Sequence, residues 1–529
     1  MLLSDAGKRI EALTREDGGE EAVYLSLFEP SQDGLPSYLE AEIDLDKMLV
    51  QEVIFARSII ADYEPQLQHP DCPQGLSICD EQGREIPYLL LEAGKGYVTR
   101  YQDHTAPEID KVNRLRVGLM LPGFACGFHE LCIRRSDKKA PSVQPAEASA
   151  IENEYYRLTV EDGAFTVEDK MRGRVHRGVN RFVDKGDAGD EYTYSWPAED
   201  AVYTLSEEGL RVSAQSLGDF GKRLILEGVL RLPEALEESR KRRSAKLVDC
   251  PVRVEVTLLD GVDRIDFHTE LQNNARDHRL QVQFPSGIST AYSEASDAFA
   301  VTRRPVDIAV PEQWAEYPQS TFPTHGFMNL EDGSYGLSAA ANGLTEAEAV
   351  REAGQTVLNL TLLRAVGWLS RTDLLTREGN GGWTIETPDA QCLGPYAFDY
   401  SIAYHAGDWR KENLFGRMEK TRLPSRLQQL EGKKPTALSR NNPLEWVSCL
   451  PENVRLSALK VAEDDSGLIL RVFEVAGEPA QVLLPLPEGM KAASLVNLAE
   501  EMPLALARRD NQISFAVRPH EIVTVKFFK

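Results

Sequence analysis

Apolar and polar positions alternate with a period of two along most of the chain from residue 22 onward. In the first part this pattern covers residues 41–45, 115–121 and 127–134, and residues 22–28 form a short apolar run that ends before Pro30. Successive side chains of a strand point to opposite faces, so this period predicts strands with one buried face. A helical signal is scarce: residues 4–13 predict one short helix, with Ser4 as its N-cap and Ile10 and Leu13 on one face.

Sequence patterns typical of strands continue to the end of the chain, with clear alternation at residues 252–259, 264–271 and 279–284. These patterns cover residues 155–160, 164–167, 174–176, 252–259, 264–271, 279–284, 468–473, 480–484, 513–517 and 522–528. Short strands separated by turn residues at this spacing predict β-sandwiches. We see no repeat of fixed period, which argues against a propeller or a solenoid. The sequence therefore predicts a mainly β chain made of several sandwiches.

Three polar segments interrupt the strands. Residues 136–149 carry two prolines and little apolar bulk, and they predict a linker and a domain boundary. Residues 423–439 predict a second break. Residues 236–246 form a run of charged side chains, most simply the solvated tip of a hairpin.

Composition and charge narrow the classes of function. The 529 residues include 42% hydrophobic and 27% charged residues, as in an ordinary globular protein. The net charge of −24 argues against a nucleic-acid partner and against an anionic membrane surface. No apolar stretch approaches the about 18–20 residues that a membrane span needs. The seven cysteines are irregularly spaced, without a CxxC pair, which indicates free thiols and a cytoplasmic location.

Residue patterns typical of metal or nucleophilic catalysis are weak. His268 and Glu270 would share one face of a strand and could serve as two metal ligands. An exposed or internally paired strand histidine explains the same pattern. The sequence has no HExxH, GxSxG or P-loop motif.

Acids, glycines and aromatic residues gather in residues 180–197. Carboxylates accept hydrogen bonds from sugar hydroxyls, and flat rings cover the C–H faces of a pyranose. Gly186 and Gly189 would let the backbone turn sharply. The side chains that suit carbohydrate are Asp187, Asp190, Tyr192, Tyr194 and Trp196. A plain surface loop is the alternative.

A second cluster spans residues 364–383, where an apolar strand leads into Arg371, Asp373 and a glycine-rich loop. The guanidinium of Arg371 offers planar donors to a ligand or to an acid. An internal pair between Arg371 and Asp373 that fixes the loop is the alternative, and the sequence leaves both open.

These stretches carry a resemblance to a known family. Residues 151–197, 366–380 and 387–405 resemble the C-terminal region of glycoside hydrolase family 38, the zinc-dependent retaining α-mannosidases, in the branch that includes mannosylglycerate hydrolases. The resemblance implies a large supersandwich similar to galactose mutarotase. It divides the chain into the end of a helical bundle (1–20), a small β-sandwich (21–140), the supersandwich (150–425) and a C-terminal β-sandwich (435–529).

The resemblance also implies which part of the enzyme carries the catalytic groups. In the family, zinc contacts the sugar hydroxyls, one carboxylate forms the glycosyl-enzyme intermediate and a second acid protonates the leaving group. These parts belong to an upstream catalytic domain, so zinc ligands and catalytic residues are expected outside this chain, which alone would be inactive. Tyr192 would reach the sugar with Asp190 orienting its loop, and Arg371 and Asp373 would border the same pocket.

The expected partners are an α-mannoside or mannosylglycerate-like sugar, the missing catalytic domain or subunit, and a second copy of the chain. One alternative is a carbohydrate-binding or scaffold protein without chemistry, which includes a subunit of a split enzyme. Another is a mutarotase or a polysaccharide lyase, which would need His268, Glu270, Tyr192 and Arg371 in one cleft.

Overall fold

The computed structural model describes residues 22–52, 73–100, 108–146, 150–310, 314–430 and 444–529. In these ranges nearly all regular structure is β-strand, as the alternation predicted, and neighbouring strands are antiparallel in every sheet. The predicted helix at residues 4–13 lies outside the described residues. No helix in the described ranges is both long and apolar enough to cross a membrane.

Two sheets near the start of the chain face each other across a shared core. The first has the order β26-β1-β6-β3, formed by Arg426–Leu430, Ala22–Glu29, Gly127–Ser136 and Gly75–Asp80. The second has the order β2-β5-β4, formed by Ser37–Glu52, Glu108–Leu121 and Tyr88–Arg100. Leu27, Ile43, Val117 and Ile133 are fully buried between them. The edge strand β26 returns from far along the chain to pair with β1, a contact that the alternation alone did not predict.

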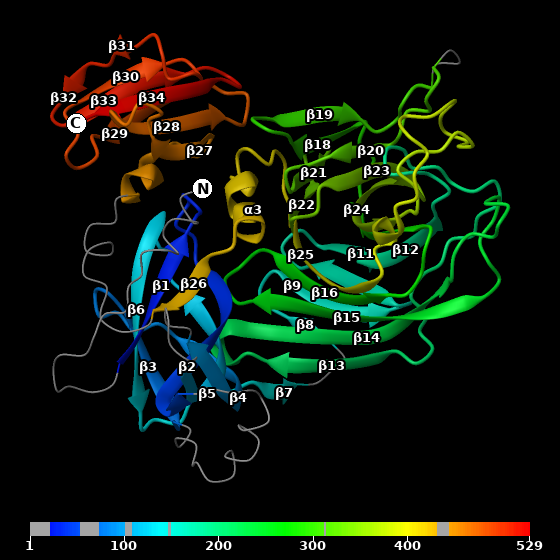
Figure 1. Ribbon diagram of the computed structural model, residues 1–529, viewed down its shortest axis with the longest axis horizontal. Helices are drawn as coiled ribbons and strands as arrows, with labels where there is room; N and C mark the ends of the chain where they lie inside the picture. Colours follow the sequence, from blue (N-terminus) through cyan, green and yellow to red (C-terminus); the bar gives the residue numbers. More distant parts are fainter. Residues whose placement is uncertain (1–21, 53–72, 101–107, 147–149, 311–313, 431–443) are drawn as a thin grey trace.

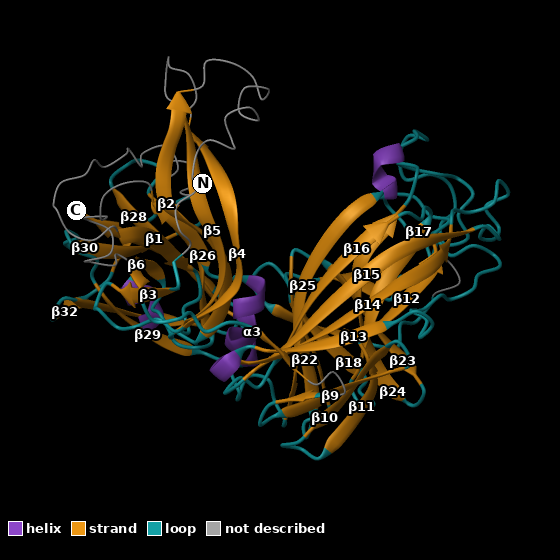
Figure 2. Cartoon of the chain, turned by 90° about the horizontal axis from the view of Figure 1, so that it is seen from below, coloured by secondary structure: helices purple, strands orange, loops and turns teal. Residues whose placement is uncertain are grey.

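A large sandwich fills the middle of the chain (Figures 1 and 2). Its ten-stranded sheet has the order β19-β18-β21-β22-β25-β16-β15-β14-β13-β7. These strands are Val301–Pro305, Tyr292–Ser296, Phe327–Glu331, Gly336–Asn342, Gly394–His405, Ile265–Asn273, Leu247–Leu259, Gly221–Pro233, Arg211–Ser216 and Gln144–Ala146. The last of them lies in the segment predicted as a linker. Proline is tolerated at Pro145 because β7 is a three-residue strand at the edge of the sheet.

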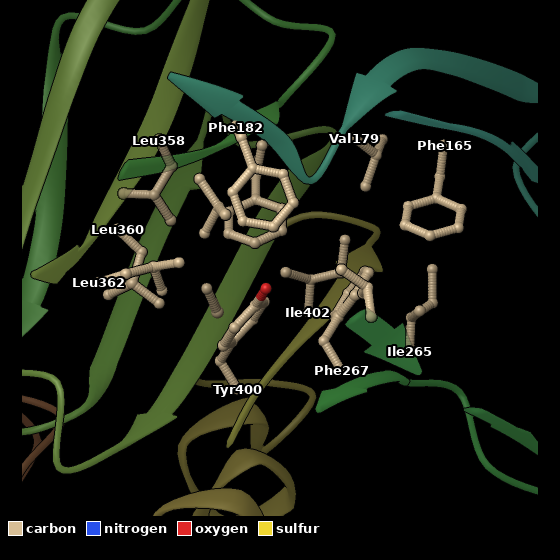
Figure 3. Packing of buried hydrophobic residues seen from close by; sticks show 14 of the residues in the cluster. Phe165, Val179, Phe182, Ile265, Phe267, Leu358, Leu360, Leu362, Tyr400 and Ile402 are labelled. Carbon is tan, nitrogen blue, oxygen red and sulfur yellow. The ribbon is translucent and has the colours of Figure 1, made fainter. Parts of the chain in front are cut away.

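Two smaller sheets cover one face of the ten-stranded sheet. One has the order β12-β17-β24-β23-β20, formed by Arg181–Gly186, His278–Pro285, Gln355–Ala365, Glu346–Glu352 and Thr321–Pro323. The other has the order β11-β10-β9-β8, formed by Arg174–Val179, Ala164–Asp169, Tyr156–Glu161 and Ile151–Glu152. Figure 3 shows their shared core, in which Phe267 of β16 lies within about 6 Å of Phe165, Phe284 and Tyr400. The Tyr400 hydroxyl donates to Asn180 Oδ1 at 2.7 Å, which satisfies a polar group inside this core.

The end of the chain forms another two-sheet unit. One sheet has the order β27-β28-β34-β30-β31, formed by Val454–Val461, Gly467–Glu474, Ile522–Phe528, Ala492–Val496 and Leu504–Ala505. The other has the order β29-β33-β32, formed by Ala480–Pro485, Gln512–Val517 and Arg508–Arg509. The described ranges also hold three short 3-10 helices, at Gly218–Phe220, Pro388–Gln391 and Glu445–Cys449. The last of these packs into the core of the C-terminal unit through Trp446 and Val447.

The helix α3 (Leu414–Arg422) lies between these units in Figure 1 and was not predicted from the sequence. Asn413 caps it, since its side chain accepts a hydrogen bond from the Gly416 amide at 3.3 Å. Leu414, Phe415 and Met418 are buried against the large sandwich and the C-terminal unit. With only nine residues, this helix is too short to give a strong periodic signal.

Candidate functional site

The strand β17 explains why polar side chains gather on the outer face of the five-stranded sheet. All eight of its residues are buried, so both of its faces are covered. Leu280, Val282 and Phe284 face the apolar core, and the alternate residues Arg279 and Gln281 point the other way. Loops that follow β12 and β24 cover this second face with polar atoms.

The loop that follows β12 is held by the buried carboxylate of Asp187. Its Oδ1 accepts a hydrogen bond from the Gly189 amide at 2.8 Å, and its Oδ2 accepts one from Arg364 Nε at 2.6 Å. Gly189 does not have a positive φ. A Cβ at this position would lie 2.1 Å from the Thr193 carbonyl oxygen. Glycine is therefore needed here for close packing, and not for the sharp turn that the sequence suggested.

Asp190 is the central acceptor of the same loop and is fully buried. Its Oδ1 accepts from the amides of Tyr192 and Thr193, and its Oδ2 accepts from the Arg371 amide at 2.8 Å and Arg377 Nη2 at 2.5 Å. Burial acts to raise the pKa of this carboxyl, but the hydrogen bonds from Arg377 and the backbone hold the pKa below its usual value. Asp190 thus binds the loop as a carboxylate.

Tyr192 leaves this rigid loop toward solvent. Its side chain is 58% exposed, and its hydroxyl has no hydrogen-bond partner among the described residues. The ring lies beside a second glycine-rich loop, because a Cβ on Gly382 would be 3.1 Å from its Cε2 and hydroxyl atoms. The structure therefore presents a fixed aromatic ring and a free hydroxyl, the groups that a sugar contact uses.

The loop after β24 is joined to the Asp190 loop by buried hydrogen bonds. Arg377 Nη1 donates to Thr193 Oγ1 at 2.6 Å, and Thr376 Oγ1 donates to the Tyr194 carbonyl at 2.9 Å. Ser370 Oγ accepts from the amides of Gly381 and Gly382. The two stretches singled out in the sequence, residues 180–197 and 364–383, thus form one structural unit.

Arg371 and Asp373 form an internal pair at the rim of this unit. The guanidinium donates to both carboxylate oxygens, at 2.7 and 2.8 Å, and lies 4.7 Å from the centre of the Trp368 ring. The hydrogen bond with Arg371 holds the pKa of Asp373 below its usual value. Of the two alternatives that the sequence left open, the pair that fixes the loop is present. Asp373 is half-exposed, so its remaining lone pairs face solvent.

Three buried or half-buried arginines support the site, and sequence reasoning did not identify their role. Arg364 and Arg377 bind Asp187 and Asp190, as described above. Arg240 Nη2 donates to the Ala188 carbonyl at 2.8 Å. In the same segment, the side chain of Arg243 is almost fully buried and pairs with Asp184 at 2.5 Å. The charged segment 236–246 forms the tip of the hairpin of β14 and β15, and most of it is exposed, as predicted. The prediction missed that Arg240 and Arg243 of this tip pack against the site.

His268 and Glu270 lie on another surface. His268 Nδ1 is 2.7 Å from Asp399 Oδ1, and this hydrogen bond raises the pKa of His268. Glu270 lines a groove of about 760 Å³ on the outer face of the ten-stranded sheet. Neither Tyr192 nor Arg371 lines this groove, whereas a mutarotase or a lyase would need all four residues in one cleft.

The donor groups of the described residues do not form a zinc site. Within these residues, no three His, Cys, Asp or Glu side chains come together in a way that could hold a metal ion. His268 and Glu270, the pair that the sequence suggested as ligands, have Asp399 nearby, but Asp399 lies at Nδ1 of His268 and Glu270 at Nε2, so the three do not converge on one point. The described part of the chain therefore does not fit the zinc that the family resemblance implies.

Comparison with known proteins gives two matching family models. Residues 151–390 match the glycosyl hydrolases family 38 C-terminal domain, and residues 453–525 match the family 38 C-terminal β-sandwich domain. A protein described as a putative mannosylglycerate hydrolase from Halalkalibacterium halodurans is 25% identical over 424 residues, which cover 77% of this chain and 44% of that protein.

Two solved structures share the fold. An alpha-mannosidase from Enterococcus faecalis V583 matches with a TM-score of 0.77 and 23% sequence identity. The matched region covers all of this chain and 58% of the alpha-mannosidase chain. A family 38 glycosyl hydrolase from Enterococcus faecalis has the same TM-score and identity, with 61% of its own chain covered. This chain thus spans less than two thirds of each of these relatives. The two family models together match more than half of the chain, and it belongs to glycoside hydrolase family 38, whose C-terminal region it carries.

Proposed function

We propose that this chain is the sugar-contacting C-terminal part of a retaining, α-mannosidase-type glycoside hydrolase that cleaves terminal α-mannosyl linkages. Family membership and the names of the relatives support this class of reaction. The observation that carries the proposal is the unit built from two distant loops, which fixes the exposed Tyr192 on a buried scaffold of Asp190 and Arg377.

The role proposed for each residue follows from its contacts. Tyr192 is the residue that touches the sugar, since its hydroxyl can both donate and accept a hydrogen bond. Asp190 is a positioning residue, because its oxygens are already used by the loop. The Arg371–Asp373 pair fixes the rim, and Asp373 keeps acceptor capacity toward solvent for a sugar hydroxyl.

In this proposal, catalysis depends on a region that lies outside this chain. That region supplies the zinc ligands, the nucleophilic carboxylate and the general acid. Large apolar side chains on the site loops support docking of such a region or of a second copy, because exposed apolar clusters mark interaction surfaces. Tyr192, Trp314, Leu375 and Trp383 are each more than half exposed. The substrate would be an α-mannoside or a mannosylglycerate-like sugar.

The proposed compartment is the cytoplasm. None of the six cysteines of the described ranges, among them the buried Cys126 and Cys250, is joined in a disulfide. Burial raises the pKa of the Cys126 thiol to about 12, so this cysteine is kept in its unreactive protonated form. Free thiols are the usual state in a reducing compartment.

The test of the proposed role is Tyr192→Phe in an enzyme that contains both this chain and a catalytic region. The variant keeps the ring and removes the hydroxyl, so we expect kcat/KM for an α-mannoside to fall by at least about tenfold, or about 1.4 kcal/mol of transition-state stabilisation. The matched control is Glu191→Gln, an exposed neighbour, which should leave kcat/KM unchanged. A smaller loss in Tyr192→Phe would contradict the role of Tyr192 as a sugar contact.

A further inference from the structure

A cavity of about 500 Å³ lies on the outer face of the five-stranded sheet, on the side of the site loop where Trp196 lies. Ligand pockets usually enclose about 300–1,000 Å³, so this volume is sufficient for a small ligand. Its floor includes Lys185 of β12, Arg279 of β17 and Glu348 of β23. Its walls come from the loops around Trp196 and Tyr317, which leave the cavity open to solvent on one side.

Two aromatic rings form a corner at the mouth of this cavity. The ring centres of Trp196 and Tyr317 are 5.4 Å apart and the rings are perpendicular, at 89°. Both side chains remain exposed, by 37% and 43%. A ring that packs on a core gains from burial, but these two rings keep part of their surface accessible to solvent. Such an accessible surface can pack against the C–H side of a pyranose ring.

The floor holds a buried cation with unused donor groups. Arg279 is only 3% exposed, and its guanidinium stacks over Tyr194 at 3.8 Å. Its Nη2 lies 3.8 Å from Glu348 Oε2, and its Nη atoms make no hydrogen bond to the described residues. Its Nε also lacks a partner but is fully enclosed, so a ligand does not reach it. The Nη atoms are therefore the donors that can bind an acceptor on a bound molecule.

Glu348 supplies the complementary acceptor. Burial acts to raise its pKa, but Arg279 and Ser320 hold the pKa below its usual value, so Glu348 stays ionised. The acceptor is fixed in place, because Gln281 Nε2 and Asn359 Nδ2 donate to its Oε2 at 3.2 and 3.4 Å. Fixed donors and fixed acceptors thus lie on the same floor.

The charges around the cavity decide which ligand fits. The lining holds two cations, Lys185 and Arg279, and three acids, Asp200, Asp307 and Glu348. Arg351 pairs with Asp307, so cations and acids balance and neither sign of charge is in excess. A neutral molecule with hydroxyl groups can hydrogen-bond to both the cations and the acids of the cavity, because a hydroxyl group both donates and accepts hydrogen bonds. The aromatic corner adds the apolar surface that a sugar ring also presents.

We propose that this cavity binds one pyranose ring of a neutral carbohydrate, stacked against Trp196 and Tyr317 and hydrogen-bonded to Arg279 and Glu348. This goes beyond the proposed function, because such binding needs neither hydrolysis nor the Tyr192 hydroxyl. With this cavity, the chain would bind a sugar without help from the catalytic region.

The test is a calorimetric titration of the full chain with the methyl α-pyranosides of mannose, glucose and galactose. We expect saturable binding of at least one of them. Trp196→Ala should weaken this binding by at least about tenfold, whereas Trp196→Phe, which keeps a flat ring, should stay within about threefold of the unchanged chain. Tyr292→Ala removes an exposed aromatic ring outside the cavity and should change nothing.

A second variant, Tyr317→Ala, repeats the test from the other wall of the corner, and circular dichroism confirms that each variant is folded. Absence of saturable binding to all three glycosides would overturn the proposal. The proposal would also be overturned if Trp196→Ala and Tyr317→Ala both bound the glycosides as tightly as the unchanged chain. Loss of binding in Tyr192→Phe with full binding in Trp196→Ala would place the sugar at Tyr192 instead, which contradicts this inference and leaves the proposed function intact.

Discussion

At Asp190, three backbone amides and one guanidinium donate to a single buried carboxylate. The acid that composition marked as a sugar ligand is thereby occupied by the protein itself. The exposed group is its neighbour Tyr192, two residues along the chain. Asp190 therefore positions the loop, and Tyr192 is the group that is available to a ligand.

Asp190→Asn tests this positioning role through stability. Removing one partner of a buried ion pair leaves Arg377 without its counter-charge, so we expect the free energy of unfolding to fall by about 3 kcal/mol at neutral pH. Thermal melting of the variant measures this loss. The exposed Asp249→Asn serves as the control and should change stability by less than about 0.5 kcal/mol.

The same carboxylate sets a pH dependence. The folded pKa of Asp190 is lowered, so its contribution is complete above the unfolded value of about 3.9 and is lost as pH falls through the lower folded value. The difference in melting temperature between the unchanged chain and Asp190→Asn should therefore be constant from neutral pH to about pH 5 and shrink below about pH 4. A difference that grows on acidification would contradict the assignment.

At the scale of elements, the alternation of β16 and β17 predicted both strands and their apolar faces. It did not predict that the polar face of β17 is buried too, because the covering loops come from residues far along the chain. The ion-pair partners of the two acids could not be predicted for the same reason. Spacing in the sequence does not indicate that Arg364 pairs with Asp187 or that Arg377 pairs with Asp190. The two site stretches themselves were visible from their composition.

Phe267→Ala tests the core that joins the three sheets of the large sandwich. Phe267 is buried among Phe165, Phe284 and Tyr400, so the variant should lose about 3–5 kcal/mol of stability. Denaturant unfolding measures this loss. Val175→Ala on the exposed side of β11 should stay within about 0.5 kcal/mol of the unchanged chain. Similar effects of the two variants would contradict the core as described.

At the scale of the whole molecule, buried ion pairs tie distant segments together around α3. Lys420 of this helix is 2.8 Å from Glu29 at the end of β1, and Arg455 of β27 is 2.6 Å from Asp33. The return of β26 to β1 adds backbone hydrogen bonds at the same junction. These contacts span about 400 residues of sequence, and they fix the sheets around a common centre (Figure 1). The domain boundaries drawn from the sequence stay predictions.

The central claim is that this chain supplies scaffold and sugar contacts for a hydrolase whose catalytic groups lie elsewhere. The most direct measurement is hydrolysis of p-nitrophenyl α-mannoside by the purified 529-residue chain with zinc added, with bound zinc determined in parallel. We predict no turnover above the buffer rate and no stoichiometric zinc. Zinc-dependent turnover would contradict the claim, and it would make His268 and Glu270 the first residues to mutate.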